Sequence, residues 1–215
     1  MKQYALVTGA SSGIGYAYAV VLAQRGYNLL IVSNEAEAIV QKGEELRRQF
    51  PHVEVRALMR DLSLQESAHE LYDWCRAEGI EVEMLVNNAG VYHDRDYLDD
   101  SARFTELIMN LHVHTPSMLM YYFGQDMRQR HKGYIINMSS VTSNFGIQRL
   151  STYSATKGYL RLLSRATHVE LREQGVYVTC VRPGAVATGL YNLTPSAIKT
   201  GLMLGYIITP ERLAQ

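Results

Sequence analysis

The chain has 215 residues, of which 47% are hydrophobic and 20% charged, and its 21 Lys and Arg residues balance its 21 Asp and Glu residues. This length accommodates one domain with a sizeable core and is too short for two ordinary domains. The composition excludes a disordered chain, and the zero net charge gives no long-range attraction to nucleic acid or anionic membranes.

Other classes are disfavoured by the distribution of apolar residues and cysteines. The longest unbroken apolar run, Tyr16 to Ala23, has eight residues, whereas about 18 are needed to span a bilayer. The first residues lead into a strand-like segment without a cleavage signal. Cys75 and Cys180 are too few for a disulfide framework or a metal cluster, and the histidines lack metal-ligand spacing with a carboxylate. We therefore expect a single-domain cytoplasmic protein without a bound metal.

Short β-branched runs alternate with longer helical segments along the chain. The predicted strands are Tyr4–Thr8, Asn28–Ser33, Val53–Leu58, Met84–Asn87, Tyr134–Met138 and Tyr177–Val181. The predicted helices are Gly13–Arg25, Glu35–Phe50, Leu64–Glu78, Ser101–Arg130 (with an interruption possible at Pro116) and Tyr153–Gln174. Several strands are apolar at consecutive positions, which is typical of parallel strands covered on both faces. The alternation predicts an α/β fold: one doubly wound, Rossmann-like parallel sheet with helices on both faces.

Two further signals concern helix ends. Ser63 followed by Glu66 predicts a capping box at the start of the third helix. The run Thr209-Pro210-Glu211 is typical of a helix start. Only four residues follow it, and so short a helix should bury little surface. We therefore expect the chain, a single domain over residues 1–215, to be truncated at its C-terminus.

A glycine-rich loop follows the first predicted strand. It reads Thr8-Gly9-Ala10-Ser11-Ser12-Gly13-Ile14-Gly15. The glycine spacing differs from the common Gly-x-Gly-x-x-Gly fingerprint, but glycines still allow a tight turn and the close approach of a pyrophosphate. The following helix start offers unpaired N–H groups and the positive end of the helix dipole, and the two serines add hydroxyl donors. An ordinary strand-to-helix turn is the alternative, and the position directly after the first strand favours a dinucleotide site.

Tyr153 and Lys157 lie four residues apart, on one face of the last predicted helix. Reduction of a ketone by a nicotinamide requires a proton donor within hydrogen-bond reach of the developing alkoxide. The ordinary pKa of tyrosine is about 10, and a neighbouring ammonium depresses it. Tyr153 is therefore predicted to act as general acid in reduction and general base in oxidation. A surface Tyr-x-x-x-Lys pair without function is the alternative interpretation.

Ser139 and Ser140 lie at the carboxyl end of the fifth predicted strand, the edge at which such sheets bind ligands. A hydroxyl there can hold the substrate oxygen, or simply cap the strand end.

The ordered motifs resemble those of the short-chain dehydrogenase/reductase family, whose cofactor loop reads Thr-Gly-x-x-x-Gly-x-Gly. The resemblance continues at Asn87-Asn88-Ala89-Gly90, Ser140, Tyr153-x-x-x-Lys157 and Pro183-Gly184, and it extends from Val7 to Thr188. It implies an NAD(P)-dependent enzyme that interconverts a ketone and a secondary alcohol. The family places its serine thirteen residues before the tyrosine, which selects Ser140 over Ser139. It also implies that Asn110 holds a water linking the active-site lysine to solvent.

The resemblance also assigns cofactor contacts. Asp61 would bind the adenine amino group, although a solvated loop carboxylate is the alternative. Asn88 to Gly90 would line the adenosine ribose, and Pro183 to Thr188 would hold the nicotinamide carboxamide. The full set of expected cofactor contacts is Gly9, Ser11, Ser12, Gly13, Ile14, Gly15, Ser33, Asn34, Asp61, Leu62, Asn88, Ala89, Gly90, Tyr153, Lys157, Pro183, Gly184, Val186 and Thr188.

The end of the second strand bears on the choice of nicotinamide. An acid there binds the ribose hydroxyls of NAD and repels a 2′-phosphate; this chain has Ser33 and Asn34 instead. No Arg or Lys stands there or at Ser12 to attract the phosphate, and Glu35 opposes it mildly. We expect NADP, with NAD possible, and higher turnover with NADPH than with NADH.

The remaining expectations concern substrate and partners. Residues 189–208 are rich in Leu, Ile, Met and Tyr and are expected to form a substrate lid, which suggests an apolar small-molecule substrate such as a 3-oxoacyl chain or a steroid-like alcohol. In the family, helices matching Ser101–Arg130 and Tyr153–Gln174 commonly form a seam between subunits, so we expect a homodimer or homotetramer. A non-catalytic NADP-binding regulatory protein is the alternative, but such proteins usually lose the tyrosine or lysine retained here. A nucleotide-sugar epimerase would need a larger C-terminal domain.

Overall fold

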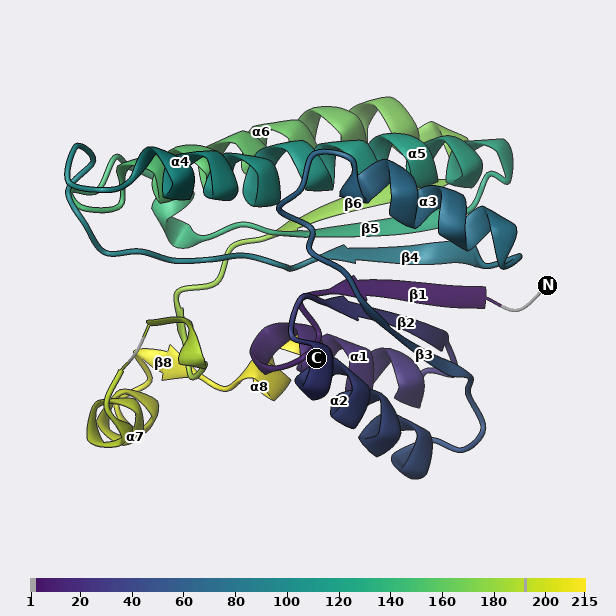
Figure 1. Cartoon of the computed structure of the whole chain (residues 1–215), viewed down its shortest axis with the longest axis horizontal. Helices are drawn as coiled ribbons and strands as arrows, with labels where there is room; N and C mark the ends of the chain where they lie inside the picture. Colours follow the sequence, from purple (N-terminus) through teal and green to yellow (C-terminus); the bar gives the residue numbers. More distant parts are fainter. Residues whose placement is uncertain (1–2, 192) are drawn as a thin grey trace.

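The computed structural model describes residues 3–191 and 193–215. Six strands form one parallel sheet in the order β3-β2-β1-β4-β5-β6, as Figure 1 shows. The strands are β1 (Gln3–Thr8), β2 (Asn28–Ser33), β3 (Val55–Met59), β4 (Glu81–Asn87), β5 (Gly133–Met138) and β6 (Val176–Val181). The chain therefore adopts the predicted doubly wound, Rossmann-like α/β fold.

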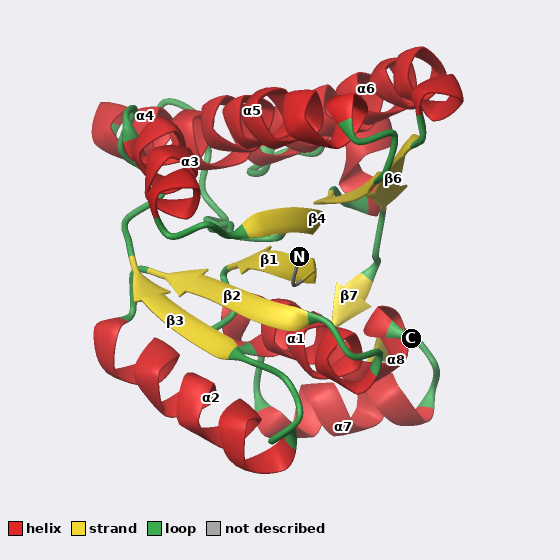
Figure 2. Ribbon diagram, turned by 90° about the vertical axis from the view of Figure 1, so that its right-hand side faces the viewer, coloured by secondary structure: helices red, strands yellow, loops and turns green. Residues whose placement is uncertain are grey.

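Helices cover both faces of the sheet (Figures 1 and 2). One layer contains α1 (Gly13–Gln24) and α2 (Ala36–Gln49), and the other contains α3 (Ser67–Ala77), α5 (Thr115–Gln129) and α6 (Ser151–Leu171). Successive residues of a strand point to opposite faces. Tyr4 and Leu6 of β1 pack in the layer of α3 and α5, and Ala5 and Val7 pack in the layer of α1. This two-sided burial explains the uninterrupted apolar runs in the sequence.

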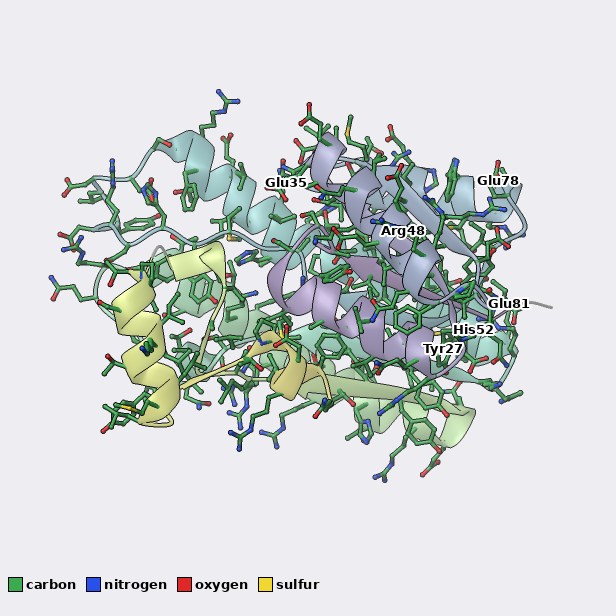
Figure 3. The ribbon with its side chains drawn as sticks, turned by 90° about the horizontal axis from the view of Figure 1, so that it is seen from below. Tyr27, Glu35, Arg48, His52, Glu78 and Glu81 are labelled. Atoms are coloured by element: carbon green, nitrogen blue, oxygen red, sulfur yellow. The ribbon has the colours of Figure 1, made fainter. Side chains whose placement is uncertain are left out.

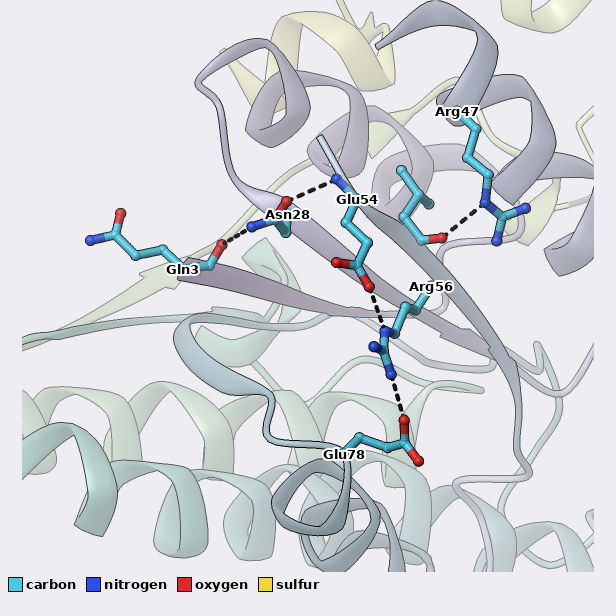
Figure 4. Close-up of polar contacts among 7 residues, drawn as sticks. Gln3, Asn28, Arg47, Glu54, Arg56 and Glu78 are labelled. Atoms are coloured by element: carbon cyan, nitrogen blue, oxygen red, sulfur yellow. Dashed lines mark hydrogen bonds and ion pairs between the residues drawn. The ribbon is translucent and has the colours of Figure 1, made fainter. Parts of the chain in front are cut away.

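A polar network joins the amino ends of three strands (Figure 4). Asn28 Nδ2 donates to the Gln3 carbonyl at 3.2 Å, and Asn28 Oδ1 accepts from the Glu54 N–H at 2.8 Å. Arg56 bridges Glu54 and Glu78 through bonds of 2.8 and 2.7 Å. These contacts tie together the starts of β1, β2 and β3. Because the strands are parallel, their carboxyl ends meet at the opposite edge of the sheet.

The predicted helix Ser101–Arg130 is divided in the structure. Its parts are α4 (Ala102–Met109), a π-helical turn at Asn110–His114, and α5 (Thr115–Gln129). Pro116 lies in the first turn of α5. Proline has no N–H to donate to the preceding turn, so the wider π turn falls where an α-helical hydrogen bond is lost. Such π turns occur frequently at functional sites.

The predicted capping box is wrong. Helix α3 begins at Ser67, and Glu66 precedes it without a side-chain cap. The N–H and hydroxyl of Ser63 instead donate to Asp61 Oδ1 at 2.9 and 2.7 Å. Short polar side chains form such local turns in competition with helix capping. The helix start therefore lies three residues further along than the capping box predicts.

The last residues pack more closely than expected. Helix α8 (Pro210–Ala214) packs against α1, and Ala214 belongs to the core on that side of the sheet. The expectation that this short helix buries little surface is therefore wrong. Between β6 and α8, β7 (Ala185–Val186) pairs in parallel with β8 (Ile207–Ile208), and α7 (Pro195–Met203) connects them. Within the described residues, no helix is long and apolar enough to cross a bilayer.

Candidate active site

A cavity of about 510 Å³ opens at the carboxyl ends of the strands. Most of the predicted site residues line it: Gly9, Ser11, Ser12, Gly13, Ile14, Ser33, Asn34, Asp61, Leu62, Asn88, Ala89, Gly90, Tyr153, Lys157, Pro183 and Thr188. The lining does not include Gly15, Asn110, Ser140, Gly184 or Val186. The lining also includes Arg60 and His112, which were not predicted from the sequence. It includes Glu35, which was predicted to oppose phosphate, Ser139, over which Ser140 was preferred, and Leu190 of the expected lid. The parallel topology thus gathers segments far apart in sequence around one cavity.

The glycine-rich loop lies directly against the residues that follow β4. Gly9 and Gly13 have φ angles of +65° and +53°, a region that L side chains rarely adopt. A Cβ atom on Gly9 would lie 2.8 Å from Ala89 Cα, and one on Gly15 would lie 2.2 Å from the Gly9 carbonyl oxygen. Gly15 therefore supports the loop from beneath, which explains why it does not line the cavity. The loop leaves the start of α1 open to an anionic group.

Thr8 fixes the segment after β4 to the end of β1. Its hydroxyl donates to the Val86 carbonyl at 3.3 Å and accepts from the N–H groups of Asn88 and Ala89 at 2.9 and 3.0 Å. Asn88 Nδ2 returns bonds to the Thr8 and Gly9 carbonyls at 3.0 and 3.2 Å. Reciprocal hydrogen bonds therefore hold the glycine-rich loop against the segment after β4, and both segments line the cavity.

Glu35 contacts the glycine-rich loop through a short polar chain. The Ser11 hydroxyl donates to the Glu35 carboxylate, and the Ser33 hydroxyl donates to Ser11 Oγ at 3.0 Å. The Glu35 N–H donates in turn to Ser33 Oγ at 3.2 Å. Figure 3 shows Glu35 at the start of α2, at the other end of the helix from Arg48. The sequence assigned Glu35 only a mild opposition to phosphate; its contact with Ser11 places a carboxylate on the cavity wall.

Tyr153 and Lys157 of α6 are brought together in the cavity, and both are buried. The Lys157 ammonium lies 5.6 Å from the centroid of the Tyr153 ring. It donates to the Met138 carbonyl at the end of β5, at 2.9 Å. Burial lowers the pKa of Lys157 to about 8, because removal from water disfavours the charged form. A buried ammonium and a phenol therefore share one wall of the cavity.

The two serines after β5 differ in their contacts. Ser139 lines the cavity, and its hydroxyl donates to the Lys157 carbonyl at 2.7 Å. The hydroxyl of buried Ser140 accepts from the Thr142 N–H at 3.2 Å, at the start of a 3₁₀ turn. Ser140 thus makes the capping contact that sequence analysis gave as its alternative role. A hydroxyl that accepts one bond still carries its own proton to donate.

The Tyr153 ring contacts two other aromatic rings. Tyr92 and His112 each meet it edge to face, with centroid distances of 5.4 and 5.7 Å. His112 belongs to the π-helical turn, as does half-buried Asn110. Sequence analysis considered the histidines only as metal ligands and so missed His112. The signal lay in its position, two residues after Asn110 in the segment expected to reach the site.

Asp61 and Thr188 both line the cavity. Asp61 follows β3, lines the cavity and is engaged with Ser63. Thr188 lies so close to the glycine-rich loop that a Cβ on Gly13 would be 3.0 Å from its methyl group. A dinucleotide fits this arrangement, since the cradle of glycines, the open helix start and the serine hydroxyls suit a pyrophosphate.

Comparison with known proteins relates these features to a family. The family model for short chain dehydrogenases matches residues 3–197. The very-long-chain 3-oxoacyl-CoA reductase of Anas platyrhynchos is 32% identical over 197 residues, which are 89% of this chain. The chain spans 62% of that relative's length.

Solved structures with the same fold cover nearly the whole chain. A short-chain dehydrogenase from Sphingobium yanoikuyae in complex with NADPH has a TM-score of 0.87 and 27% identity, covering 100% of this chain and 82% of that one. The bulky-bulky ketone specific alcohol dehydrogenase from Comamonas testosteroni has a TM-score of 0.82 and 27% identity, covering 98% of this chain and 86% of that one. With its glycine-rich loop and its Tyr153–Lys157 pair on one cavity, the chain belongs to the short-chain dehydrogenase family.

Proposed function

We propose that this protein is an NADP(H)-dependent oxidoreductase that interconverts a ketone and a secondary alcohol. The observation that carries the proposal is the buried Tyr153–Lys157 pair, which shares one cavity with the glycine-rich loop. The loop suits a dinucleotide and the pair suits proton transfer. Together they meet the two requirements of carbonyl reduction, a hydride source and a proton donor beside it.

Tyr153 supplies the proton in the proposed mechanism. A nicotinamide held in the cavity would supply the hydride for the carbonyl carbon. The Tyr153 hydroxyl, on the cavity wall, would donate its proton to the carbonyl oxygen. The Lys157 ammonium, 5.6 Å from the ring centroid, favours the phenolate that remains. Burial of both groups strengthens this attraction, because the local dielectric constant is lower than that of water. In the oxidative direction the phenolate takes up the proton of the alcohol.

Ser140 and Asn110 complete the proposed machinery. The Ser140 hydroxyl accepts from Thr142 and keeps its proton for the substrate oxygen, which orients the carbonyl for attack. Asn110, on the π-helical turn, is proposed to hold a water that links Lys157 to solvent. Both roles carry over from the family pattern described above.

NADP(H) is the proposed cofactor, in line with the NADPH named in the Sphingobium yanoikuyae structure. Its pyrophosphate would lie on the glycine-rich loop, its adenine beside Asp61 and Leu62, and its nicotinamide beside Pro183, Gly184, Val186 and Thr188. Asn34 lines the cavity where Rossmann folds bind the 2′ substituent, and its side-chain amide can donate a hydrogen bond there. The hydroxyl protons of Ser11 and Ser33 are already donated to Glu35 and to Ser11 Oγ. The carboxylate of Glu35 opposes the 2′-phosphate, so NAD(H) is proposed as a second, weaker cofactor.

The proposed substrate is an apolar ketone, such as a 3-oxoacyl chain or a steroid-like molecule. The names of the Anas platyrhynchos and Comamonas testosteroni relatives, which refer to a very-long-chain 3-oxoacyl-CoA and to bulky ketones, support this class. Residues 189–208 are proposed to form its lid. Leu190 already lines the cavity, while Leu202, Met203, Leu204 and Tyr206 of the same segment are exposed. An apolar substrate would give these side chains surface to cover.

The protein is proposed to form a homo-oligomer. Large apolar side chains stand exposed on α5 and α6, with Tyr121 60%, Leu162 59% and Val169 63% exposed. Exposed apolar patches of this kind mark association sites. The helices are those that the family uses between its subunits, and they are proposed to do so here.

A non-catalytic NADP-binding regulator is the second candidate. It would need the cavity and the glycine-rich loop but no proton donor. The buried ammonium of Lys157 is costly to keep away from water. A regulator without a proton donor would have no use for it, so its presence favours the enzyme. Turnover of a ketone with NADPH separates the two candidates.

Replacing Tyr153 with Phe is expected to lower kcat at least about a hundredfold, because general acid catalysis contributes factors of about 10² to 10⁴. NADPH oxidation is measured with a series of ketones and 3-oxoacyl thioesters of increasing chain length. Tyr177→Phe, an exposed tyrosine stacked on Tyr134, is the matched control and should retain activity. Full activity of Tyr153→Phe would remove the proposed proton donor, and absence of turnover by the wild type would favour the regulator.

The lowered pKa of Lys157 predicts how stability depends on pH in the cofactor-free protein. Between pH 8 and the ordinary lysine pKa, the unfolded chain holds a proton that the folded chain has lost, so stability rises with pH. The free energy of unfolding of the wild type minus that of Lys157→Met should increase by roughly 2 kcal/mol from about pH 7 to pH 10. Denaturant titrations at several pH values test this, and the titrations of groups remote from Lys157 cancel in the difference. A flat difference contradicts the prediction.

Replacing Glu35 with Gln is expected to raise kcat/KM for NADPH relative to NADH by about tenfold. The substitution removes a negative charge near the 2′-phosphate while keeping an acceptor for Ser11. Initial rates with both cofactors give the ratio. Glu37→Gln, on the same helix and exposed, is the control. A ratio that stays at the wild-type value, or a wild type that prefers NADH, would contradict this account.

Sedimentation velocity at micromolar concentration is expected to show a dimer or tetramer. Leu162→Glu should shift the protein to monomer, because a charge would be buried in the contact. Arg172→Glu, at the end of the same helix, is a comparison outside the apolar patch. A wild type that sediments only as monomer argues against the seam.

A further inference from the structure

We infer that His112 is a positioning residue for the proposed proton donor: as a neutral imidazole of fixed tautomer, it ties the loop after β4 to α6 and holds the Tyr153 ring in place. This inference rests on the proposed function and goes beyond it, since neither the family motifs nor the sequence pattern assigns His112 a role.

The contacts of His112 join three separate segments. The side chain is 1% exposed and projects from the π-helical turn. Its Nε2 accepts from the Val91 N–H at 2.9 Å, in the loop after β4. Its Nδ1 lies 3.2 Å from the Thr156 hydroxyl, on α6 between Tyr153 and Lys157. The imidazole therefore spans the space between the cavity wall and the helix that carries the proton donor.

The hydrogen bonds determine one tautomer. Nε2 faces an N–H group and must be an unprotonated acceptor. The Thr156 hydroxyl donates its proton to the Tyr153 carbonyl at 2.8 Å, so Thr156 Oγ1 can only accept from His112. Nδ1 therefore carries the proton. Neutral His112 satisfies both partners, whereas a protonated Nε2 would point a second N–H at Val91.

The electrostatic surroundings keep this form neutral. Burial and the neighbouring Lys157 charge lower the pKa of His112 well below its ordinary value. Lys157 faces it from α6, while the hydroxyl of Thr156 and the backbone of Val91 provide the polar contacts from the packed elements. The imidazole thus stays uncharged through the physiological range, and Lys157 is left as the cation beside Tyr153.

The loop after β4 packs closely against one edge of the His112 ring. A Cβ on Gly90 would lie 2.8 Å from Nε2, so the loop approaches the ring as closely as glycine allows. The loop continues into Tyr92, whose ring meets the Tyr153 ring edge to face at a centroid distance of 5.4 Å. His112 itself meets that ring at 5.7 Å and 73°. By holding Val91, His112 positions the adjacent Tyr92, which contacts the Tyr153 ring. The His112 ring is itself the second aromatic contact of Tyr153.

Two conservative substitutions separate the two hydrogen bonds. His112→Gln can place an oxygen near the position of Nε2 and keep the Val91 bond, whereas His112→Asn can place an N–H near Nδ1 and keep the Thr156 bond. His112→Phe keeps a ring of similar size and removes both. His114→Gln is the matched control, because His114 lies in the same π-helical turn and does not line the cavity.

The test measures kcat and KM for NADPH and for the best ketone found with the wild type. His112→Phe should lower kcat at least about tenfold, since small misplacements of catalytic groups cost up to about 10²-fold, while KM for NADPH changes less than about threefold. His112→Gln should recover kcat to within about threefold of the wild type, and His114→Gln should match the wild type. Circular dichroism and thermal unfolding confirm that each variant is folded.

The outcomes distinguish this inference from the function on which it rests. An active wild type with unchanged kcat in folded His112→Phe overturns the role of His112 alone. A parallel rise of KM for NADPH with no loss of kcat assigns His112 to cofactor binding and overturns positioning. If His112→Phe is unfolded, the Gln and Asn variants decide, and wild-type kcat in both overturns the inference. A wild type without any turnover overturns the proposed function and this role together.

Discussion

The contact on which the site depends is the one between the glycine-rich loop and the segment after β4. Two backbones meet there at a distance that excludes even a methyl group, as the positions of Gly9 and Gly15 against Ala89 and each other require. Because Thr8 and Asn88 close the same contact with reciprocal hydrogen bonds, it is fixed in direction as well as distance. This contact positions two parts of the cavity wall, the glycine-rich loop at the start of α1 and the segment after β4.

Lys157 illustrates how the fold sustains an unfavourable group. Its ammonium is buried, has one carbonyl partner given by the end of β5, and lies on the same helix as Tyr153. Removal from water disfavours its charge, and the surrounding sheet and helices supply the stability that allows it. Buried charged groups with shifted pKa values are characteristic of functional sites. The neutral imidazole of His112 nearby adds no second charge to the same region.

The sequence predicted the fold and much of the cavity lining because both depend on local signals. Consecutive apolar residues in β1 and β2 marked a parallel sheet, and glycines after β1 marked a ligand loop. Helix starts were harder to predict. Asp61 holds Ser63 in a local Asx turn, and the sequence alone does not decide whether this turn or the capping box forms. The position of His112, two residues after Asn110, was compatible with a place in the site, but its role could not be predicted, because that role arises from a π turn and from bonds to residues far along the chain. Glu35 was recognised, but its contact with Ser11 required the three-dimensional structure.

The polar network at the amino ends of β1, β2 and β3 has a consequence for how this molecule can vary. Asn28, Glu54 and Arg56 maintain strand alignment at the edge remote from the cavity. Alignment of these strands is thereby anchored independently of the loops that surround the ligand. Apart from the glycine-rich loop and the segment packed against it, loops at the cavity edge can accept new residues, and hence new ligands, while the sheet keeps its register. The amino ends of the strands thus keep the sheet aligned, and sequence changes can concentrate in the loops at the carboxyl ends.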